Sequence, residues 1–379
     1  MKKLLSLLLA AAMMLVVFSG CGTAESSTSD TASTGTSATE EAAAPGSQAE
    51  PKSNEKIALV TDVGNIDDES FNQTCWEAVV AYGEANGVET IYYKPTEDST
   101  DSRVLSITQA VNEGATVVVL PGYLFGEAIG LTQDKFPDVK FIAVDVGEGD
   151  LGDTKLASNA YSMVFHEEQA GYLAGYAAVK EGYTKLGFLG GIEVPAVQRY
   201  GYGYIQGVDA AAEEMGVDVE LKYTYGGQFF GDANITAKME GWYSDGTEVV
   251  FACGGSIYTS AVEAANKYEG KVIGVDVDQS HIDPCIITSA MKGLYSATYT
   301  ALETYFGGKW DTIGGTLANL SLTEGDYVGL PTDTWSLKNF TVDEYNTLVD
   351  GIKNGSVSIS DSIEAMPEVG AHVTLTKIS

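Results

Sequence analysis

From residue 56 onward, short apolar runs alternate with longer segments that mix apolar and polar residues. The apolar runs are continuous and rich in β-branched residues: "KIALVTD", "TVVVLPG", "KFIAVDVG", "KLGFLGG", "EVVFACGG" and "KVIGVDVD". Runs of this kind are typical of strands that are buried on both faces of a parallel sheet. The mixed segments have helical spacing; in "SFNQTCWEAVVAYGEANG", Phe71, Cys75 and Val79 fall on one face.

The order of these elements predicts the fold class. Alternation of strands and helices implies parallel sheets with right-handed crossover connections. The strands are too many for one comfortable sheet, and the pattern starts again at "YSMVFHEEQAGYLAG", near residue 161. We therefore predict an α/β protein with two doubly wound lobes.

The N-terminal part of the chain has a different character. "MKKLLSLLLAAAMMLVVFSGC" has two lysines, an apolar stretch and small residues before Cys21, which is the layout of a secretory signal with a lipobox-like ending. We expect residues 1–20 to be removed as a signal peptide and Cys21 to carry the lipid anchor. Residues 21–55 are rich in Ser, Thr, Ala, Gly and Glu, a composition that predicts a disordered linker. The lipid would hold the protein at the extracytoplasmic face of the cell membrane.

The acidic composition excludes several classes of partner. The chain has 53 acidic and 21 basic residues, a formal net charge of −32. Nucleic acids and anionic lipid surfaces attract basic patches, so we expect neither to be a partner. An acidic surface well covered by water fits an exported soluble protein.

Three predicted strands end on an aspartate: Asp62 after "IALVT", Asp145 after "KFIAV" and Asp276 after "KVIGV". Parallel sheets bind ligands beyond the carboxyl ends of their strands. A carboxylate can accept two parallel hydrogen bonds from a vicinal diol, such as that of a sugar. One such aspartate would equally fit a turn or a helix cap, but three together predict a shared binding edge for a neutral polyhydroxy ligand.

Aromatic and amide side chains follow the first of these strand ends. Phe71 and Asn72 begin the helix after Asp62 and offer a flat ring beside hydrogen-bonding groups. This pair suits a flat heteroaromatic ligand stacked on the phenyl ring. Phe71 also has the spacing of a core residue, so the helix pattern leaves both readings open.

Four further residues are candidates on weaker grounds. Phe229 and Phe230 lie in the Gly-flanked loop "GGQFFGD", where they would either contact a ligand or cover a core edge. Gly254 ends the strand in "FACGG" and allows close backbone approach or a tight turn. Lys292, in "ITSAMKG", is one of few basic residues near a strand end, and an ordinary surface lysine is its alternative.

The sequence contains no common catalytic or metal-binding motif. It lacks a Walker A sequence, HExxH and GxSxG, and His166, His281 and His372 are far apart. The acidic clusters at 67–69 and 276–283 do not have EF-hand spacing. We expect no metal, no cofactor and no enzymatic activity, with a calcium site at these clusters and a glycosidase pair of carboxylates as the alternatives.

Three cysteines remain once Cys21 is set aside. Cys75 falls in a helical pattern and Cys253 in an apolar run, and neither forms a CxxC motif with another cysteine. We expect these two and Cys285 to be small buried hydrophobic residues, with a single disulfide as the alternative.

Four stretches in order resemble the basic membrane protein family. They are "ALVTDVGNIDDESFNQTCWEA", "YSMVFHEEQAGYLAGYAA", "GFLGGIEVPAVQRYGYGYIQGV" and "VIGVDVDQ…ITSAMKG". This family comprises substrate-binding lipoproteins of ABC importers, including purine-nucleoside receptors. The resemblance implies a type I periplasmic-binding-protein fold with the ligand between the lobes. Residues 56–161 with about 286–318 would form the first lobe, and residues 162–285 with about 319–379 the second.

The resemblance also implies ligand-binding positions. They are Asp62, Phe71, Asn72, Asp145, Phe230, Gly254, Asp276 and Lys292. Phe71 and Phe230 would sandwich a nucleobase, with Phe229 as the alternative register for the second ring, and Asp276 would bind the ribose.

The function implied is capture of a nucleoside, in particular a purine nucleoside, and its delivery to an ABC permease driven by a separate ATPase. We expect a monomer. Where the family often has "Gly-Gly-Thr-Gly", this chain reads "GGSIY", which would place Ile257 and Tyr258 at the rim of the site. A sugar or another nucleobase compound therefore stays an alternative ligand, and a ligand sensor stays an alternative role.

Overall fold

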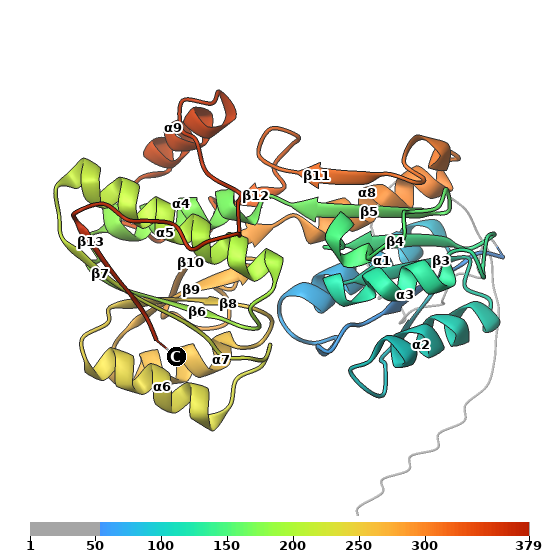
Figure 1. Ribbon diagram of the computed structural model, residues 1–379, viewed down its shortest axis with the longest axis horizontal. Helices are drawn as coiled ribbons and strands as arrows, with labels where there is room; N and C mark the ends of the chain where they lie inside the picture. The colour runs from blue at the N-terminus through green and yellow to red at the C-terminus, as the bar shows by residue number, and fades with distance from the viewer. Residues whose placement is uncertain (1–53, 379) are drawn as a thin grey trace, which may run out of the picture. The chain divides into compact units, whose positions relative to one another are not determined.

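The computed structural model describes residues 54–378 (Figure 1). The expected signal peptide, Cys21 and nearly all of the expected linker lie outside the described residues. Within residues 54–378 the main strands form two sheets, of six and seven strands, each with helices on both faces. The prediction of two doubly wound α/β lobes is confirmed.

The first sheet has the strand order β11-β5-β4-β3-β1-β2, and all its pairings are parallel. Its strands, in chain order, are β1 Lys56–Val60, β2 Glu89–Tyr93, β3 Val117–Pro121, β4 Lys140–Val144, β5 Ala160–Phe165 and β11 Leu317–Leu320. Helices α1 (Phe71–Asn86) and α8 (Leu294–Phe306) cover one face, while α2 (Thr100–Asn112) and α3 (Gly126–Thr132) cover the other. The apolar strand runs are therefore buried from both sides, as their composition predicts.

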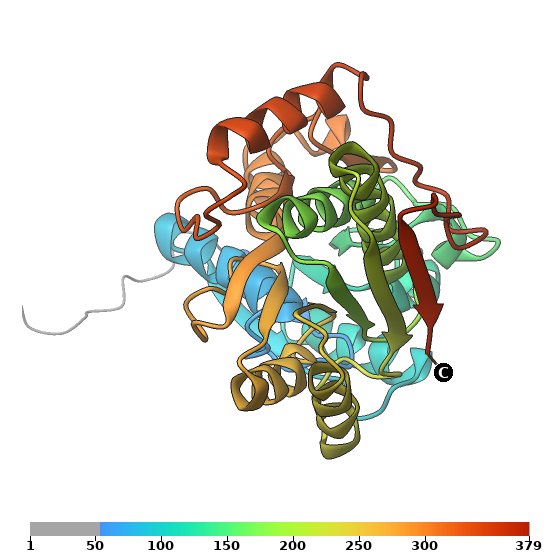
Figure 2. The same ribbon diagram turned by 90° about the vertical axis from the view of Figure 1, so that its left-hand side faces the viewer.

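The second sheet has the order β12-β10-β9-β8-β6-β7-β13 and is parallel except for the β10–β12 pair. Its strands are β6 Lys185–Gly190, β7 Val219–Tyr225, β8 Val249–Cys253, β9 Lys271–Asp276, β10 Ile286–Lys292, β12 Val328–Gly329 and β13 Val373–Lys377. Its helices are α4 Glu167–Glu181, α5 Pro195–Met215, α6 Ala233–Ser244, α7 Tyr258–Tyr268 and α9 Val342–Lys353. Figure 2 shows α4 and α5 on one face of this sheet, with α6 and α7 on the other.

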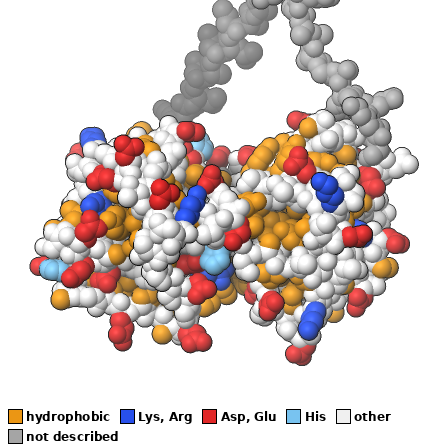
Figure 3. All heavy atoms as spheres, turned by 90° about the horizontal axis from the view of Figure 1, so that it is seen from above, with side chains coloured by type: hydrophobic (Ala, Val, Ile, Leu, Met, Phe, Trp, Pro, Cys, Tyr) orange, Lys and Arg blue, Asp and Glu red, His pale blue; other side chains and the backbone are white. Residues whose placement is uncertain are grey.

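Three short 3₁₀ helices complete the described elements: η1 Tyr123–Phe125, η2 Glu148–Leu151 and η3 Trp310–Thr312. Figure 3 shows acidic side chains spread over the face it presents, with lysine and arginine side chains placed singly among them. This distribution fits the solvated acidic surface expected from the net charge of −32.

The chain crosses between the lobes slightly later than the sequence suggested. Strand β5, expected to end the first lobe near residue 161, extends to Phe165 in the first sheet. Residues from about 286 were expected in the first lobe, but β10 pairs with β9 in the second sheet. The chain returns at Gly293, after which α8 packs against α1. The sequence could not show this because the mixture of apolar and polar residues in Ile286–Lys292 does not favour one sheet over the other.

Helices α4 and α5 are in backbone contact through glycines. A Cβ atom added at Gly171 or Gly175 would overlap a backbone carbonyl of α5, and one added at Gly203 or Gly207 would overlap a carbonyl of α4. Close packing of this kind leaves no space for a side chain to adapt. The contact fixes the first turns of α4 and α5 relative to each other.

Candidate functional site

A cavity of about 660 Å³ lies between the two lobes, at the carboxyl ends of both sheets. This volume is within the usual range for small-molecule sites. Every ligand-binding position predicted from the sequence lines it: Asp62, Phe71, Asn72, Asp145, Phe230, Gly254, Asp276 and Lys292. The three aspartates come from the ends of β1, β4 and β9, so parallel strand ends from both sheets meet around one space.

Two of these aspartates have unusual backbone geometry. The φ angle is +60° at Asp145 and +66° at Asp276, in the left-handed region that residues with a Cβ seldom adopt. Such conformations are strained and persist only where the surrounding structure maintains them. They are common at ligand-binding sites. The sharp turn comes at the carboxyl end of each strand, where both aspartates line the cavity.

Asn72 holds the carboxylate of Asp62 in place. Asp62 Oδ1 accepts hydrogen bonds from the Gly64 amide at 2.7 Å and from Asn72 Nδ2 at 2.9 Å. A Cβ at position 64 would overlap the Asn72 amide, so this close approach requires glycine. Burial raises the pKa of Asp62, and the bonds from Gly64 and Asn72 oppose that rise. These bonds use Oδ1, and Oδ2 accepts no hydrogen bond from the described residues.

Asp68 is a residue of the site that the sequence reasoning missed. It is buried, lines the cavity and accepts hydrogen bonds from the backbone amides of Ser70, Asn72 and Gln73 at 3.0–3.2 Å. Burial raises its pKa to about 6, although these bonds act in the opposite direction. The sequence indicated this residue only by its position, because Asp68 lies just before a helical pattern and aspartates commonly cap helices.

Lys292 joins the two lobes. Its Nζ atom, from β10, lies 2.5 Å from Asp145 Oδ2 beyond β4 and 3.0 Å from Glu167 Oε1. It also lies 5.3 Å from the ring centre of Phe71, a cation–π distance. The surface-lysine alternative is wrong, because the side chain is only 2% exposed. Burial raises the pKa of Asp145, Lys292 lowers it, and Asp145 Oδ1 is buried without a hydrogen-bond partner among the described residues.

Glu167 and Arg199 form a second ion pair that the sequence reasoning missed. Arg199 Nε, from α5, lies 2.5 Å from Glu167 Oε2 in the first turn of α4. Glu167 has no exposed surface, whereas Arg199 lines the cavity. Burial alone would raise the pKa of Glu167, but Arg199 and Lys292 together bring it below the usual range. The sequence contains one indication that Arg199 has a special role: arginine is rare, and Arg103 and Arg199 are the only two in the chain.

Asp276 also makes a contact between the lobes. Its Oδ2 accepts a hydrogen bond from Ser70 Oγ, just before α1, at 2.6 Å, and its Oδ1 lies 3.4 Å from the hydroxyl of Tyr200. Burial raises its pKa, while Lys292 and Ser70 oppose the rise. The carboxylate is thus oriented from both lobes at once.

The two predicted aromatics differ in exposure. Phe71 is partly buried against the core, whereas the side chain of Phe230 is 56% exposed. Phe229 also lines the cavity, with its ring against Gly254. Phe229 and Phe230 therefore both line the cavity, and the ring of Phe230 is the more exposed.

The expectation that Ile257 and Tyr258 of "GGSIY" lie at the rim of the site is wrong. Ile257 has no exposed surface and Tyr258 is 6% exposed, and both belong to the core on the α6–α7 face of the second sheet. Neither lines the cavity. The reason is that Gly254 and Gly255 have φ angles of +140° and +51°, which turn the chain into α7 immediately after β8.

The remaining candidates for chemistry contribute little. Cys75, Cys253 and Cys285 are buried and free. Within residues 54–378, no group of His, Cys, Asp and Glu side chains is arranged to hold a metal ion. None of the helices described there has the length and apolar character needed to cross a membrane.

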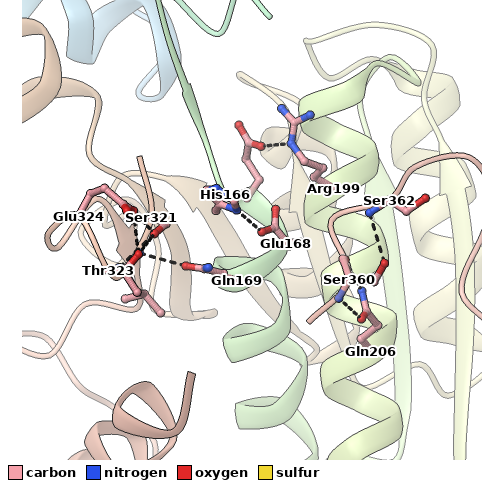
Figure 4. Close-up of polar contacts among 12 residues, drawn as sticks. His166, Glu168, Gln169, Arg199, Gln206, Ser321, Thr323, Glu324, Ser360 and Ser362 are labelled. Carbon is pink, nitrogen blue, oxygen red and sulfur yellow. Dashed lines mark hydrogen bonds and ion pairs between the residues drawn. The ribbon is translucent and has the colours of Figure 1, made fainter. Parts of the chain in front are cut away.

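His166 occupies the crossing between β5 and α4. Its backbone amide donates to the Leu320 carbonyl at 3.0 Å, and its Nδ1 lies 2.7 Å from Glu168 Oε1 (Figure 4). Glu168 is 2% exposed. The hydrogen bond to Glu168 raises the pKa of His166, and burial opposes that rise. The imidazole therefore stabilises a buried carboxylate at this crossing when it is protonated.

We expect this pair to make stability fall as the pH rises. A histidine whose pKa is higher in the folded state contributes fully below its unfolded pKa, about 6.5. The contribution disappears as the pH rises through the higher folded pKa. The free energy of unfolding of the wild type should exceed that of His166→Gln more at about pH 6 than at about pH 9. A difference that grows with pH would contradict this prediction.

The sequence is similar to a known protein family and to several characterised proteins. Residues 55–362 match the model of the Bmp family, described as "ABC transporter substrate-binding protein PnrA-like". The chain is 30% identical to basic membrane protein A1 of Borrelia garinii, over 71% of this chain and 78% of that protein. It is 27% identical to the ABC transporter nucleoside-binding protein BmpA of Lactococcus lactis, over 81% of this chain and 91% of that protein.

Solved structures share the fold. An ABC transporter solute-binding protein from Aeropyrum pernix has a TM-score of 0.66 at 23% identity, over 80% of this chain and 87% of that one. One from Conexibacter woesei has a TM-score of 0.65 at 23% identity, over 81% and 99% of the two chains. These likenesses confirm the predicted fold of a type I periplasmic binding protein.

Proposed function

Because the chain belongs to the Bmp family of PnrA-like ABC transporter substrate-binding proteins, we propose that it captures an uncharged nucleoside, a purine nucleoside in particular. The family consists of extracytoplasmic transport components, not enzymes, with a small-molecule ligand and a membrane permease as partners. The observation that carries the proposal is that carboxylates of Asp62, Asp145 and Asp276 share one cavity with the rings of Phe71 and Phe230.

In this proposal the nucleobase stacks between Phe71 and Phe230, and the ribose and the polar edge of the base meet the carboxylates. Asp62 Oδ2 and Asp145 Oδ1 accept no hydrogen bond from the described residues. Asp145 Oδ1 is buried, and a buried acceptor is costly when unpaired, so a hydroxyl or N–H donor of a ligand would be favoured there.

Ligand capture would be coupled to closure of the lobes. Lys292 with Asp145, and Ser70 with Asp276, are contacts across the cavity that break when the lobes separate. A ligand favours the closed state only by the difference in its affinity for the two states. The closed form would dock on the permease, and a separate ATPase would drive transport.

The proposal includes a lipid anchor. Cleavage after residue 20 would leave Cys21 as the first residue of a lipoprotein, held as a monomer at the outer face of the membrane. The intact mass of the protein extracted from membranes tests this, because an acylated Cys21 adds the mass of its lipid. An unmodified mass would rule the anchor out.

Titration calorimetry against a panel tests the ligand class. The panel holds purine nucleosides, pyrimidine nucleosides, free sugars and amino acids. We expect the tightest binding with a purine nucleoside, and binding of a sugar without binding of nucleosides would overturn the proposal. Uptake of a labelled nucleoside by cells with and without the gene separates transport from sensing.

Replacing Asp276 by Asn should weaken nucleoside binding. The change removes charge-assisted hydrogen bonds worth about 1.5–3 kcal/mol each, so the Kd should rise at least about tenfold. Asp278→Asn is the matched control, because Asp278 bonds to Thr334 at 2.7 Å and does not line the cavity. Equal affinities of the two variants would count against the proposed site.

A further inference from the structure

Both cations of the cavity wall contact the same buried acid. Among the described lining residues, Arg199 and Lys292 are the basic ones. Arg199 Nε lies 2.5 Å from Glu167 Oε2 (Arg199 is labelled in Figure 4), and Lys292 Nζ lies 3.0 Å from Glu167 Oε1. Glu167 itself has no exposed surface and stands behind the wall. Each of its oxygens therefore pairs with one cation: Oε2 accepts a hydrogen bond from Arg199, and Oε1 pairs with Lys292 by charge, without a hydrogen bond.

The other charged side chains of the wall are acidic. Its acidic side chains are Asp62, Asp68, Asp98, Asp145, Glu148, Asp150 and Asp276. Lys292 is neutralised on two sides, since Asp145 contacts it at 2.5 Å in addition to Glu167. An anion entering this cavity would meet several carboxylates and, among the described lining residues, no cation without an acidic partner.

The charge on Glu167 is maintained by its surroundings. Burial favours the neutral acid, but Arg199 and Lys292 bring the pKa of Glu167 below the usual range, so the carboxylate is ionised at neutral pH. The glycine contact between α4 and α5 also fixes the distance between Glu167 and Arg199, because neither helix can shift along the other.

We propose that Glu167 is a specificity-determining residue, which holds both cations of the cavity and so makes it reject phosphorylated analogues of its ligand. Discrimination by unfavourable charge contacts is a general route to specificity. The inference rests on the nucleoside function proposed above and deepens it: the ligand is the unphosphorylated nucleoside. A hydrolysis of the phosphate ester must then release the ligand from any nucleotide before capture.

Glu167→Gln is the direct test. Glutamine keeps the size of the side chain but has one acceptor oxygen, and its NH₂ group is a donor facing the other cation. One cation would then be available to a phosphate. The full-length protein is titrated with a purine nucleoside and with its 5′-monophosphate, and the ratio of the two Kd values is the readout.

We expect the wild type to bind the monophosphate at least about 100-fold more weakly than the nucleoside. In Glu167→Gln this ratio should shrink at least about tenfold. Glu168→Gln is the matched control, because Glu168 is a buried acid on the same turn that bonds to His166 at 2.7 Å and makes no ion pair with Arg199 or Lys292. Its ratio should match that of the wild type.

A double variant shows whether Glu167→Gln acts through an unpaired cation or through misfolding. Glu167→Gln with Arg199→Gln removes a cation together with its acid, and removal of both partners costs less than removal of one. Lys292 then stays paired with Asp145, so rejection of the monophosphate should return.

Three results would overturn the inference. They are a wild type that binds both ligands equally, an unchanged ratio in Glu167→Gln, and an equal fall of the ratio in Glu168→Gln. A wild type that binds no nucleoside would instead overturn the proposed function, so the two failures can be told apart.

Discussion

Replacing Lys292 by Met should destabilise the protein by about 3–5 kcal/mol and abolish measurable nucleoside binding. The ammonium group contacts Asp145 at 2.5 Å and Glu167 at 3.0 Å, and both acids are buried. Methionine fills similar space but leaves two carboxylates without this cation. Chemical denaturation followed by fluorescence gives the free energy of unfolding, and calorimetry gives the affinity.

The control and the pH dependence sharpen this test. Lys267→Met removes a lysine that is 55% exposed and pairs with Glu240, so its effect on stability should be far smaller than that of Lys292→Met. Without Lys292, the pKa of Asp145 should rise further, because Lys292 now lowers it. A raised acid pKa in the folded state makes stability fall as the pH rises through it. The cost of Lys292→Met should therefore be larger at about pH 8 than at about pH 5, and a larger cost in acid would contradict this account.

Replacing Gly203 by Ala should destabilise the protein by about 3 kcal/mol, at the upper end of overpacking costs. The added Cβ would overlap the backbone carbonyl of Glu168 in α4, and a backbone atom cannot move aside as a side-chain end can. The displacement should also weaken nucleoside binding, since Glu167 and Arg199 lie beside this contact. Thermal and chemical denaturation measure the stability.

Gly241→Ala is the matched control for this variant. Gly241 lies within α6, and a Cβ built there meets nothing within 4 Å. Alanine has the higher helix propensity, so this change should be neutral or stabilising by up to about 1 kcal/mol. Equal losses in the two variants would contradict the view that the contact between α4 and α5 makes Gly203 sensitive to an added Cβ.

The sequence predicted the strands and the three strand-end aspartates for a physical reason. Fully buried parallel strands have continuous apolar composition, and their carboxyl ends lie on one edge of each sheet. Residues directly after such runs are therefore placed by the topology alone. Asp62, Asp145 and Asp276 share a cavity because of this rule, although their binding role stays a proposal.

What the sequence could not show depends on contacts between distant elements. The ion pair of Glu167 with Arg199 depends on the close contact of α4 with α5 at their glycines. No local sequence pattern predicts this contact. The burial of Lys292 follows from its position between the lobes, where Asp145 reaches it from the first sheet. The burial of Ile257 depends on two glycine φ angles at the end of β8.

The bonds that join Lys292 to Asp145 and Ser70 to Asp276 also bear on the kinetics of capture. The lobes can part only when these bonds break, so a solute has to wait for an opening before it can enter the cavity. Above a certain solute concentration, the association rate should therefore level off at the frequency of opening. Uptake would then keep a constant pace in rich surroundings and vary with supply only in poor ones.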